Sequence, residues 1–321
     1  MRASLPPAIA ALFVLMFASL FVGVSSISLP LLWAQGMDGQ AAQVLFASRV
    51  PRTLALVLAG AGMAVAGLIM QMLVRNRFVE PSTVGTVEAA TFGILLVTIF
   101  APGLPVIGRM GVAAFCALAG TALFMHILRF VPLRSILMVP LIGILLSGVI
   151  GAVTTFFAYR YDLLQSLGAW TSGDFSIVLR GRYEILWVAG FMTMVAYIAA
   201  DRFTVAGLGK DFSTNLGLDY RKVVALGLIV VALVSASVVV TVGMIPFLGL
   251  VVPNVVSLMI GDNLRRALPL VAVMGAGMVL VCDIIGRLLI HPYEIPIGVM
   301  MGMIGSAFFL YLLLRKNARA A

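Results

Sequence analysis

The chain has 321 residues, of which 62% are hydrophobic and only 10% are charged, and its formal net charge is +9. A mean hydropathy of +1.16 excludes a water-soluble enzyme or nucleic-acid-binding domain, and it indicates a chain that crosses a membrane many times. At about 20 apolar residues per crossing, this length allows about ten helices and almost no domain outside the membrane.

Apolar runs bounded by polar or turn residues mark ten candidate spans. We expect the third and eighth to be partial, tilted or broken, because Glu88 lies near the start of the third and Pro246 precedes the short eighth. A further stretch, Leu163–Trp170, is too short to span and is expected to lie on the surface between helices five and six. The ten runs are Ala8–Val24, Leu54–Val74, Val84–Ala101, Met110–Leu128, Ile136–Ala158, Ile185–Ala200, Val223–Val242, Phe247–Ile260, Ala267–Ile285 and Ile295–Leu314.

Small residues recur at four-residue spacing in two of these runs, which allows helix backbones to approach closely in a membrane. The second and ninth runs also share a Gly-Ala-Gly-Met string, at 60–63 and 275–278, without a regular internal repeat. The predicted fold is therefore an all-α polytopic bundle that forms one domain over residues 1–321. The small residues are Gly143, Ser147 and Gly151 in the fifth run, and Gly298, Gly302 and Ser306 in the tenth.

The basic residues predict the orientation of the bundle. With ten crossings and a cytosolic N-terminus, 14 of the 21 Lys and Arg residues fall on the cytosolic side, including every lysine. Both termini are then expected in the cytosol. The basic residues left on the outer side are Arg49, Arg52, Arg109, Arg160, Arg180, Arg182 and Arg287.

The longest polar interruption between two spanning runs is the stretch 207–222, which this orientation places in the cytosol. Phe212 and Leu216 lie one helical turn apart there, so we expect a short amphipathic helix, capped by Asp211 and ended by Gly217. Such a helix presses its apolar side into a partner. The alternative is an ordinary solvated loop.

Several kinds of chemistry lack the residues they need. A phosphate-binding P-loop requires Gly-Lys-Ser or Gly-Lys-Thr, and no lysine of this chain is followed by Ser or Thr, so ATP-driven work requires a separate ATPase. An ion-coupled carrier would use Glu88 or Asp283, whose neighbours are mainly apolar, but Arg287 four residues after Asp283 favours a local ion pair. No catalytic cluster and no metal site are expected, which disfavours a membrane-embedded enzyme.

A series of motifs occurs in a characteristic order and spacing along nearly the whole chain. Together these motifs resemble the FecCD family, the permease subunits of bacterial ABC importers for iron–siderophore complexes, haem and cobalamin. The motifs are Arg49-Val-Pro-Arg52 with Gln71, Arg75-Asn76-Arg-Phe-Val-Glu80-Pro81 with Gly85, Gly243-Met-Ile-Pro-Phe-Leu-Gly-Leu-Val-Val-Pro253, Gly261-Asp262, Asp283 with Arg287, and Glu294-Ile-Pro296-Ile-Gly298.

The resemblance implies a permease subunit in a bacterial inner membrane, with ten helices and an equal or related second permease around one translocation path. It implies two cytosolic ATPases that hold the ATP and Mg, a periplasmic binding protein, and no cofactor bound by this chain. It also implies that the cytosolic stretch 207–222 couples to an ATPase. The coupling residues are then Lys210, Asp211, Phe212, Ser213, Thr214, Asn215, Leu216, Gly217 and Leu218.

The same resemblance implies that three outer arginines dock the binding protein. Arg49, Arg52 and Arg287 match positions that meet acidic residues on the two lobes of the binding protein. Because exposed ion pairs contribute only about 0–1 kcal/mol, their expected effect is on docking register and association rate more than on affinity.

The sequence departs from the common family pattern in three places. The usual Asn-Pro-Leu-Ala-x-Pro reads Asn76-Arg-Phe-Val-Glu-Pro81, the usual Gly-Ala reads Ala89-Ala90, and the usual Pro-His-x-x-Arg reads Pro253-Asn254-Val-Val-Ser257. This variant is most similar to the ferric-siderophore branch, so we expect an iron–siderophore complex as cargo. Cobalamin or haem transport, and an ion-coupled carrier, are the alternatives.

Overall fold

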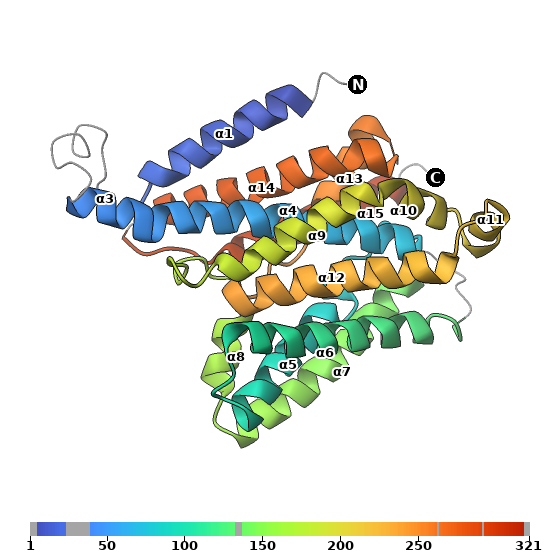
Figure 1. The fold of residues 1–321 in the computed structure, drawn as a ribbon, viewed down its shortest axis with the longest axis horizontal. Helices are drawn as coiled ribbons and strands as arrows, with labels where there is room; N and C mark the ends of the chain where they lie inside the picture. The colour runs from blue at the N-terminus through green and yellow to red at the C-terminus, as the bar shows by residue number, and fades with distance from the viewer. Residues whose placement is uncertain (1–4, 24–38, 132–136, 262, 291, 318–321) are drawn as a thin grey trace.

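The computed structural model describes residues 5–23, 39–131, 137–261, 263–290 and 292–317. Within these ranges the regular secondary structure is helical throughout, as the all-α prediction requires. Five helices are long and apolar enough to cross a membrane, a bent pair makes a sixth such segment, and four shorter apolar helices accompany them. These segments correspond to the ten predicted spans and lie together in one bundle (Figure 1).

The elements follow the predicted order with a few additions. Short elements outside the spans are the 3-10 helix η2 (Pro81–Thr83), α8 (Leu164–Thr171) and α11 (Lys210–Asn215). Other short elements lead into spanning helices: α3 (Gln40–Val44) and the π-helical η1 (Leu45–Arg49) precede α4, and the 3-10 helix η3 (Glu184–Leu186) precedes α9. The spanning elements are α1 (Leu5–Phe21), α4 (Val50–Val74), α5 (Thr86–Phe100), α6 (Val106–Ile127), α7 (Met138–Arg160), α9 (Trp187–Ile198) with α10 (Ala200–Ala206), α12 (Tyr220–Val242), α13 (Leu248–Ile260), α14 (Leu264–Leu289) and α15 (Ile297–Asn317).

Helix α4 is the centre of the bundle and packs against α9, α12, α13 and α14. Its crossing with α14 is very close, because a Cβ atom added at Gly60 would lie 2.7 Å from the carbonyl oxygen of Gly275. A Cβ atom at Gly275 would lie 2.5 Å from the carbonyl oxygen of Gly60. The Gly-Ala-Gly-Met string shared by the two helices therefore marks the point where their backbones meet, as small residues allow in membrane bundles.

Helices α5, α6 and α7 form a second group, with α5 packed against both of the others and α6 packed against α12. Much of α7 faces outward, where Leu145, Val149 and Phe156 are exposed. The small residues of the fifth and tenth runs divide between two environments. Gly143 and Gly298 are in close backbone contacts, as predicted, whereas Gly151 and Gly302 have open space beside them.

Most predicted spans match observed helices within a few residues, and the short α5 and α13 confirm that the third and eighth spans are partial. The predicted surface stretch Leu163–Trp170 is α8. Two predicted boundaries, Val24 and Ile136, lie outside the described residues. The largest error concerns the second span, because helical structure begins at Gln40 and continues for 35 residues to Val74, through Arg49 and Arg52.

The predicted sixth span is not one straight helix. Helix α9 ends at Ile198, and α10 continues from Ala200 at an angle of 67° to the helical segment before it. This bend carries the chain into α11, which protrudes at the end of the bundle opposite α3 (Figure 1).

Candidate functional site

The predicted cytosolic helix is present as α11, and the sequence shows why it is short. Gly217 has φ of +78°, a left-handed conformation that glycine adopts without a steric penalty. Its N–H donates to the carbonyl oxygen of Thr214 at 2.9 Å, and the N–H of Leu218 donates to that of Ser213 at 3.0 Å. This Schellman arrangement ends the helix where the sequence predicts.

The start of α11 differs from the prediction. Its N-cap is Gly209, which provides no side-chain cap, so the predicted capping role of Asp211 is wrong. Asp211 instead lies in the first turn, where a carboxylate interacts favourably with the positive end of the helix dipole. The following connection is capped differently. Asp219 accepts the backbone N–H of Lys222 at the start of α12, and this bond and the Lys222 ammonium lower the pKa of Asp219.

Helix α11 has an anchored side and an exposed apolar side. Ser213 is fully buried, and its hydroxyl lies 3.0 Å from the carbonyl oxygen of Val205 and 2.7 Å from that of Gly209. Phe212 and Leu216 are 52% and 59% exposed on the same helix. Exposed large apolar side chains beside a buried anchor are typical of a surface that a partner covers. Of the predicted coupling residues, Ser213 therefore fastens α11 to the subunit and does not face a partner.

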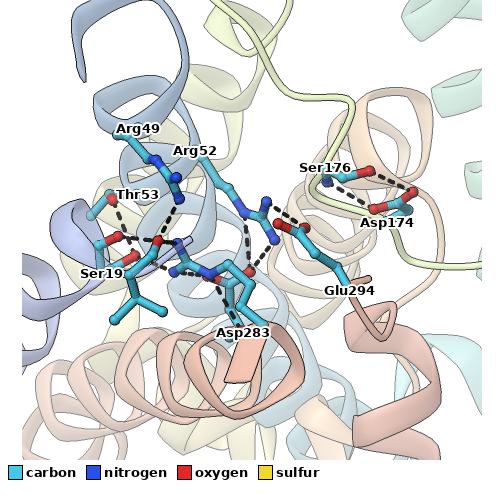
Figure 2. Close-up of polar contacts among 10 residues, drawn as sticks. Ser19, Arg49, Arg52, Thr53, Asp174, Ser176, Asp283 and Glu294 are labelled. Carbon is cyan, nitrogen blue, oxygen red and sulfur yellow. Dashed lines mark hydrogen bonds and ion pairs between the residues drawn. The ribbon is translucent and has the colours of Figure 1, made fainter. Parts of the chain in front are cut away.

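The three predicted docking arginines come together at the opposite end of α4, together with two carboxylates. Figure 2 labels Arg49, Arg52 and the carboxylates of Asp283 and Glu294. The Nη2 and Nε atoms of Arg52 donate to Oδ1 of Asp283 at 2.6 and 3.1 Å, and its Nη1 donates to Oε2 of Glu294 at 2.7 Å. Arg287 donates to the other oxygen of Asp283. The ion pair inferred from the four-residue spacing of Asp283 and Arg287 is thus confirmed.

Two of these arginines, Arg49 and Arg287, also bind the end of α1 or the residue that follows it. Arg287 donates to the carbonyl oxygens of Ser19 at 3.1 Å and of Val22 at 2.5 Å, and Arg49 donates to the carbonyl oxygen of Val22. The hydroxyl of Thr53 lies 3.3 Å from that of Ser19. We call this group the outer ion cluster. Its members are Arg49, Arg52, Arg287, Asp283 and Glu294, together with Ser19, Val22 and Thr53. It ties the ends of α1, α4 and α14 to the connection that holds Glu294.

This geometry limits how the arginines meet a binding protein. Arg49, Arg52 and Arg287 are only 7%, 9% and 3% exposed, so the subunit itself covers most of each side chain. Their docking role stays a prediction. In such docking, an acidic side chain of the binding protein would approach these guanidinium groups. Those of Arg52 and Arg287 already pair with Asp283.

Sequence reasoning missed the structural role of Glu80, which is 1% exposed in the connection between α4 and α5. Its Oε1 accepts the backbone N–H of Phe247, the N-cap residue of α13, at 2.7 Å. Phe247 has φ of +62°, which is unusual for a bulky residue. Asn254 of α13 donates to the carbonyl oxygen of Arg77 at 2.8 Å. Two of the motifs that depart from the family pattern therefore bind each other.

Replacing Glu80 with Ala should lower the stability of the subunit by about 1–2 kcal/mol, because the start of α13 loses its acceptor. Glu80→Gln keeps an acceptor oxygen and should cost less. The measurement is the thermal midpoint of the purified complex in detergent. Glu184→Ala is the matched control, because Glu184 accepts one backbone N–H on an exposed loop. Equal shifts for Glu80→Ala and Glu184→Ala would contradict the assignment.

Comparison with known proteins gives a consistent set of relatives. The model of a family described as the FecCD transport family matches residues 11–315. The petrobactin import system permease protein YclN of Bacillus subtilis is 47% identical over 310 residues, which cover 96% of this chain and 97% of that protein. The ferric-anguibactin transport system permease protein FatD of Vibrio anguillarum is 42% identical, covering 97% and 98%.

More distant relatives include the vitamin B12 import system permease protein BtuC of Vibrio cholerae, which is 30% identical over 86% of this chain and 84% of that protein. Among solved structures, an inward-facing conformation of a metal-chelate type ABC transporter matches with a TM-score of 0.81 and 26% identity. That match covers 98% of this chain and 100% of the other. The fold and the family resemblance thus point to the same class of membrane protein.

Proposed function

The chain belongs to the FecCD transport family, and from this premise we propose that it is the permease subunit of an ABC importer that carries an iron–siderophore complex across the bacterial inner membrane. Relatives whose names specify petrobactin or ferric-anguibactin are 42–47% identical to it. The vitamin B12 permease is 30% identical. This difference favours an iron chelate over cobalamin as the cargo.

The observation that carries the proposal is the exposed apolar side of α11. Phe212 and Leu216 stand out from the subunit on a helix that Ser213 fixes in place. A cytosolic ATPase groove would cover these side chains. Because the chain has no P-loop, ATP and Mg would be bound by two such ATPases and not by this subunit.

The remaining partners follow from the same proposal. A periplasmic binding protein would deliver the cargo at the end that carries the outer ion cluster, and a second copy or a related permease would complete the path. Both termini would lie in the cytosol, in agreement with the positive-inside count. The exposed face of α7, with Leu145, Val149 and Phe156, is suited to contact either that second permease or lipid.

The mechanism is alternating access. ATP binding would draw the two ATPases together and move α11, which follows the bent α9–α10 pair after the short connection 207–209. A Cβ atom at Gly209 would lie 3.0 Å from a guanidinium nitrogen of Arg75, the C-cap residue of α4, so the start of α11 lies beside the side chain that follows the central helix. Movement at α11 would thus reach the helix that carries Arg52 at its other end. Rigid-body rearrangement of the bundle then changes the side to which the path is open.

An ion-coupled carrier receives less support. Asp283, one of its two candidate carboxylates, is held by Arg52 and Arg287. A carboxylate that is paired with two guanidinium groups is poorly suited to take up and release a proton during transport.

The cargo can be identified with reconstituted vesicles that contain the permease and its ATPases. A binding protein loaded with a ferric siderophore should stimulate ATP hydrolysis severalfold, whereas a cobalamin-loaded binding protein should not. The unloaded binding proteins provide the baseline. Stimulation by the cobalamin-loaded protein alone would reject the siderophore assignment while leaving the ABC permease assignment in place.

A further inference from the structure

A pocket of about 220 Å³ lies between α5, α7, α8 and the connection before α13. Its walls include Glu88 and Thr91 from α5, Thr154 from α7 and Thr171 from α8. Gly151 of α7 also lines it and leaves room, because a Cβ atom added there would have no neighbour within 4 Å. The pocket is distinct from α11 and from the outer ion cluster.

Glu88 brings a carboxyl group with one unpaired oxygen to this pocket. Its Oε2 atom is buried and makes no hydrogen bond within the described ranges, and Ser147 of α7 is a polar neighbour of the same carboxyl group. Asp283, by contrast, uses both oxygens in ion pairs. No ion pair with Glu88 occurs among the described residues. A buried carboxylate oxygen without a partner is costly, so a ligand that supplies a donor would be stabilised there.

Three of the threonines that line the pocket with Glu88 have already used their donors. The hydroxyl of Thr91 donates to the carbonyl oxygen of Val87 at 3.0 Å, and that of Thr154 donates to Ile150 at 2.8 Å. The Thr171 hydroxyl donates to the carbonyl oxygen of Leu167 at 3.0 Å. Because a hydroxyl has one proton and two lone pairs, these groups offer the pocket only acceptors.

We propose that this pocket binds a protonated amine of the transported chelate. An ammonium group supplies three donors and a positive charge, which match one carboxylate and several acceptor-only hydroxyl oxygens. The inference rests on the proposed import function and extends it to a class of cargo, namely iron chelates with a cationic arm. The pocket would contact that arm during passage, while the rest of the chelate lies in the translocation path.

The test compares two synthetic ferric chelates that differ only at one arm, which ends in a primary ammonium group or in a neutral methoxy group. Vesicles contain the complete transporter, with a binding protein saturated with either chelate, and uptake of radioactive iron is measured with ATP. Glu88→Gln preserves the shape of the side chain. It should reduce uptake of the ammonium chelate at least about tenfold, as expected for loss of a hydrogen bond to a charged group, and change uptake of the methoxy chelate less than about twofold.

Two variants of α7 provide a second test that leaves Glu88 in place. Gly151→Val projects a side chain beside the pocket and should selectively slow the ammonium chelate. Gly148→Val is the matched control, because Gly148 also has open space beside it but does not line the pocket. Equal effects of Gly151→Val and Gly148→Val would contradict the proposal.

Other outcomes separate this inference from the proposed function. If wild-type vesicles import the chelates with ATP but Glu88→Gln affects both equally or neither, the pocket assignment is overturned and the import function stands. If wild-type uptake of both chelates is lost when sodium is replaced by N-methylglucamine, the pocket holds an inorganic cation and the amine assignment is wrong. If wild-type vesicles import neither chelate with ATP, the proposed function fails, and the pocket assignment with it.

Discussion

A subunit with Phe212→Asp and Leu216→Asp is expected to insert and fold but to lose nearly all ATP-driven uptake. The two side chains are 52% and 59% exposed, so the isolated subunit tolerates the change. In a covering ATPase groove, however, the new carboxylates would be desolvated without partners, at a cost of about 2 kcal/mol or more each. Co-purification of the ATPase and uptake of the iron chelate are the measurements.

The control for this double variant is Arg202→Asp, which places a carboxylate on the exposed side of α10, outside the predicted coupling residues, without removing an apolar contact. It should retain the ATPase and most of the uptake. Full uptake by the double variant would contradict the groove model of α11. Loss of membrane insertion would show that the two side chains stabilise the subunit itself, which their exposure argues against.

The second large effect is expected at the outer ion cluster. Arg52→Ala should destabilise the subunit by about 3–5 kcal/mol, because Asp283 and Glu294 lose a guanidinium partner at a site where Asp283 is fully buried. The thermal midpoint of the purified complex measures this loss. Docking of the binding protein should weaken as well, since the ends of α1, α4 and α14 are no longer held together.

Arg265→Ala is the matched control for the ion cluster. Arg265 pairs with Asp201 on the surface, where both side chains are more than half exposed, so its removal should leave the thermal midpoint unchanged. An Arg52→Ala variant with normal stability but lost docking would show that Arg52 acts on the binding protein alone. A variant with normal stability and normal docking would contradict both roles.

The number and order of the helices could be predicted because lipid requires long apolar runs with internally satisfied backbones. The start of the second span could not. Arg49 and Arg52 have the appearance of interfacial residues that end a helix, whereas Asp283, more than 230 residues away, neutralises Arg52 inside the subunit. A partner so distant in sequence leaves no local signal.

The polarity of the stretch 207–222 predicted a short helix that the structure shows as α11, and Gly217 marked its end. The inward orientation of Ser213 depends on the bend between α9 and α10. The sequence at this bend contains no Gly or Pro that would have predicted it. The motif changes at Glu80 and Asn254 were visible as departures from the family pattern. Only the fold shows that both residues form hydrogen bonds that join the α4–α5 connection to α13.

We propose that ATP hydrolysis by separate subunits, acting through α11, powers import through this bundle. The most direct test of this proposal is uptake of a radioactive ferric siderophore into vesicles that contain the permease, its ATPases and the loaded binding protein. We predict uptake that requires ATP and Mg and is unchanged when an ionophore collapses the proton gradient. Uptake that requires the proton gradient and persists in vesicles without the ATPases would contradict ATP-driven import through α11.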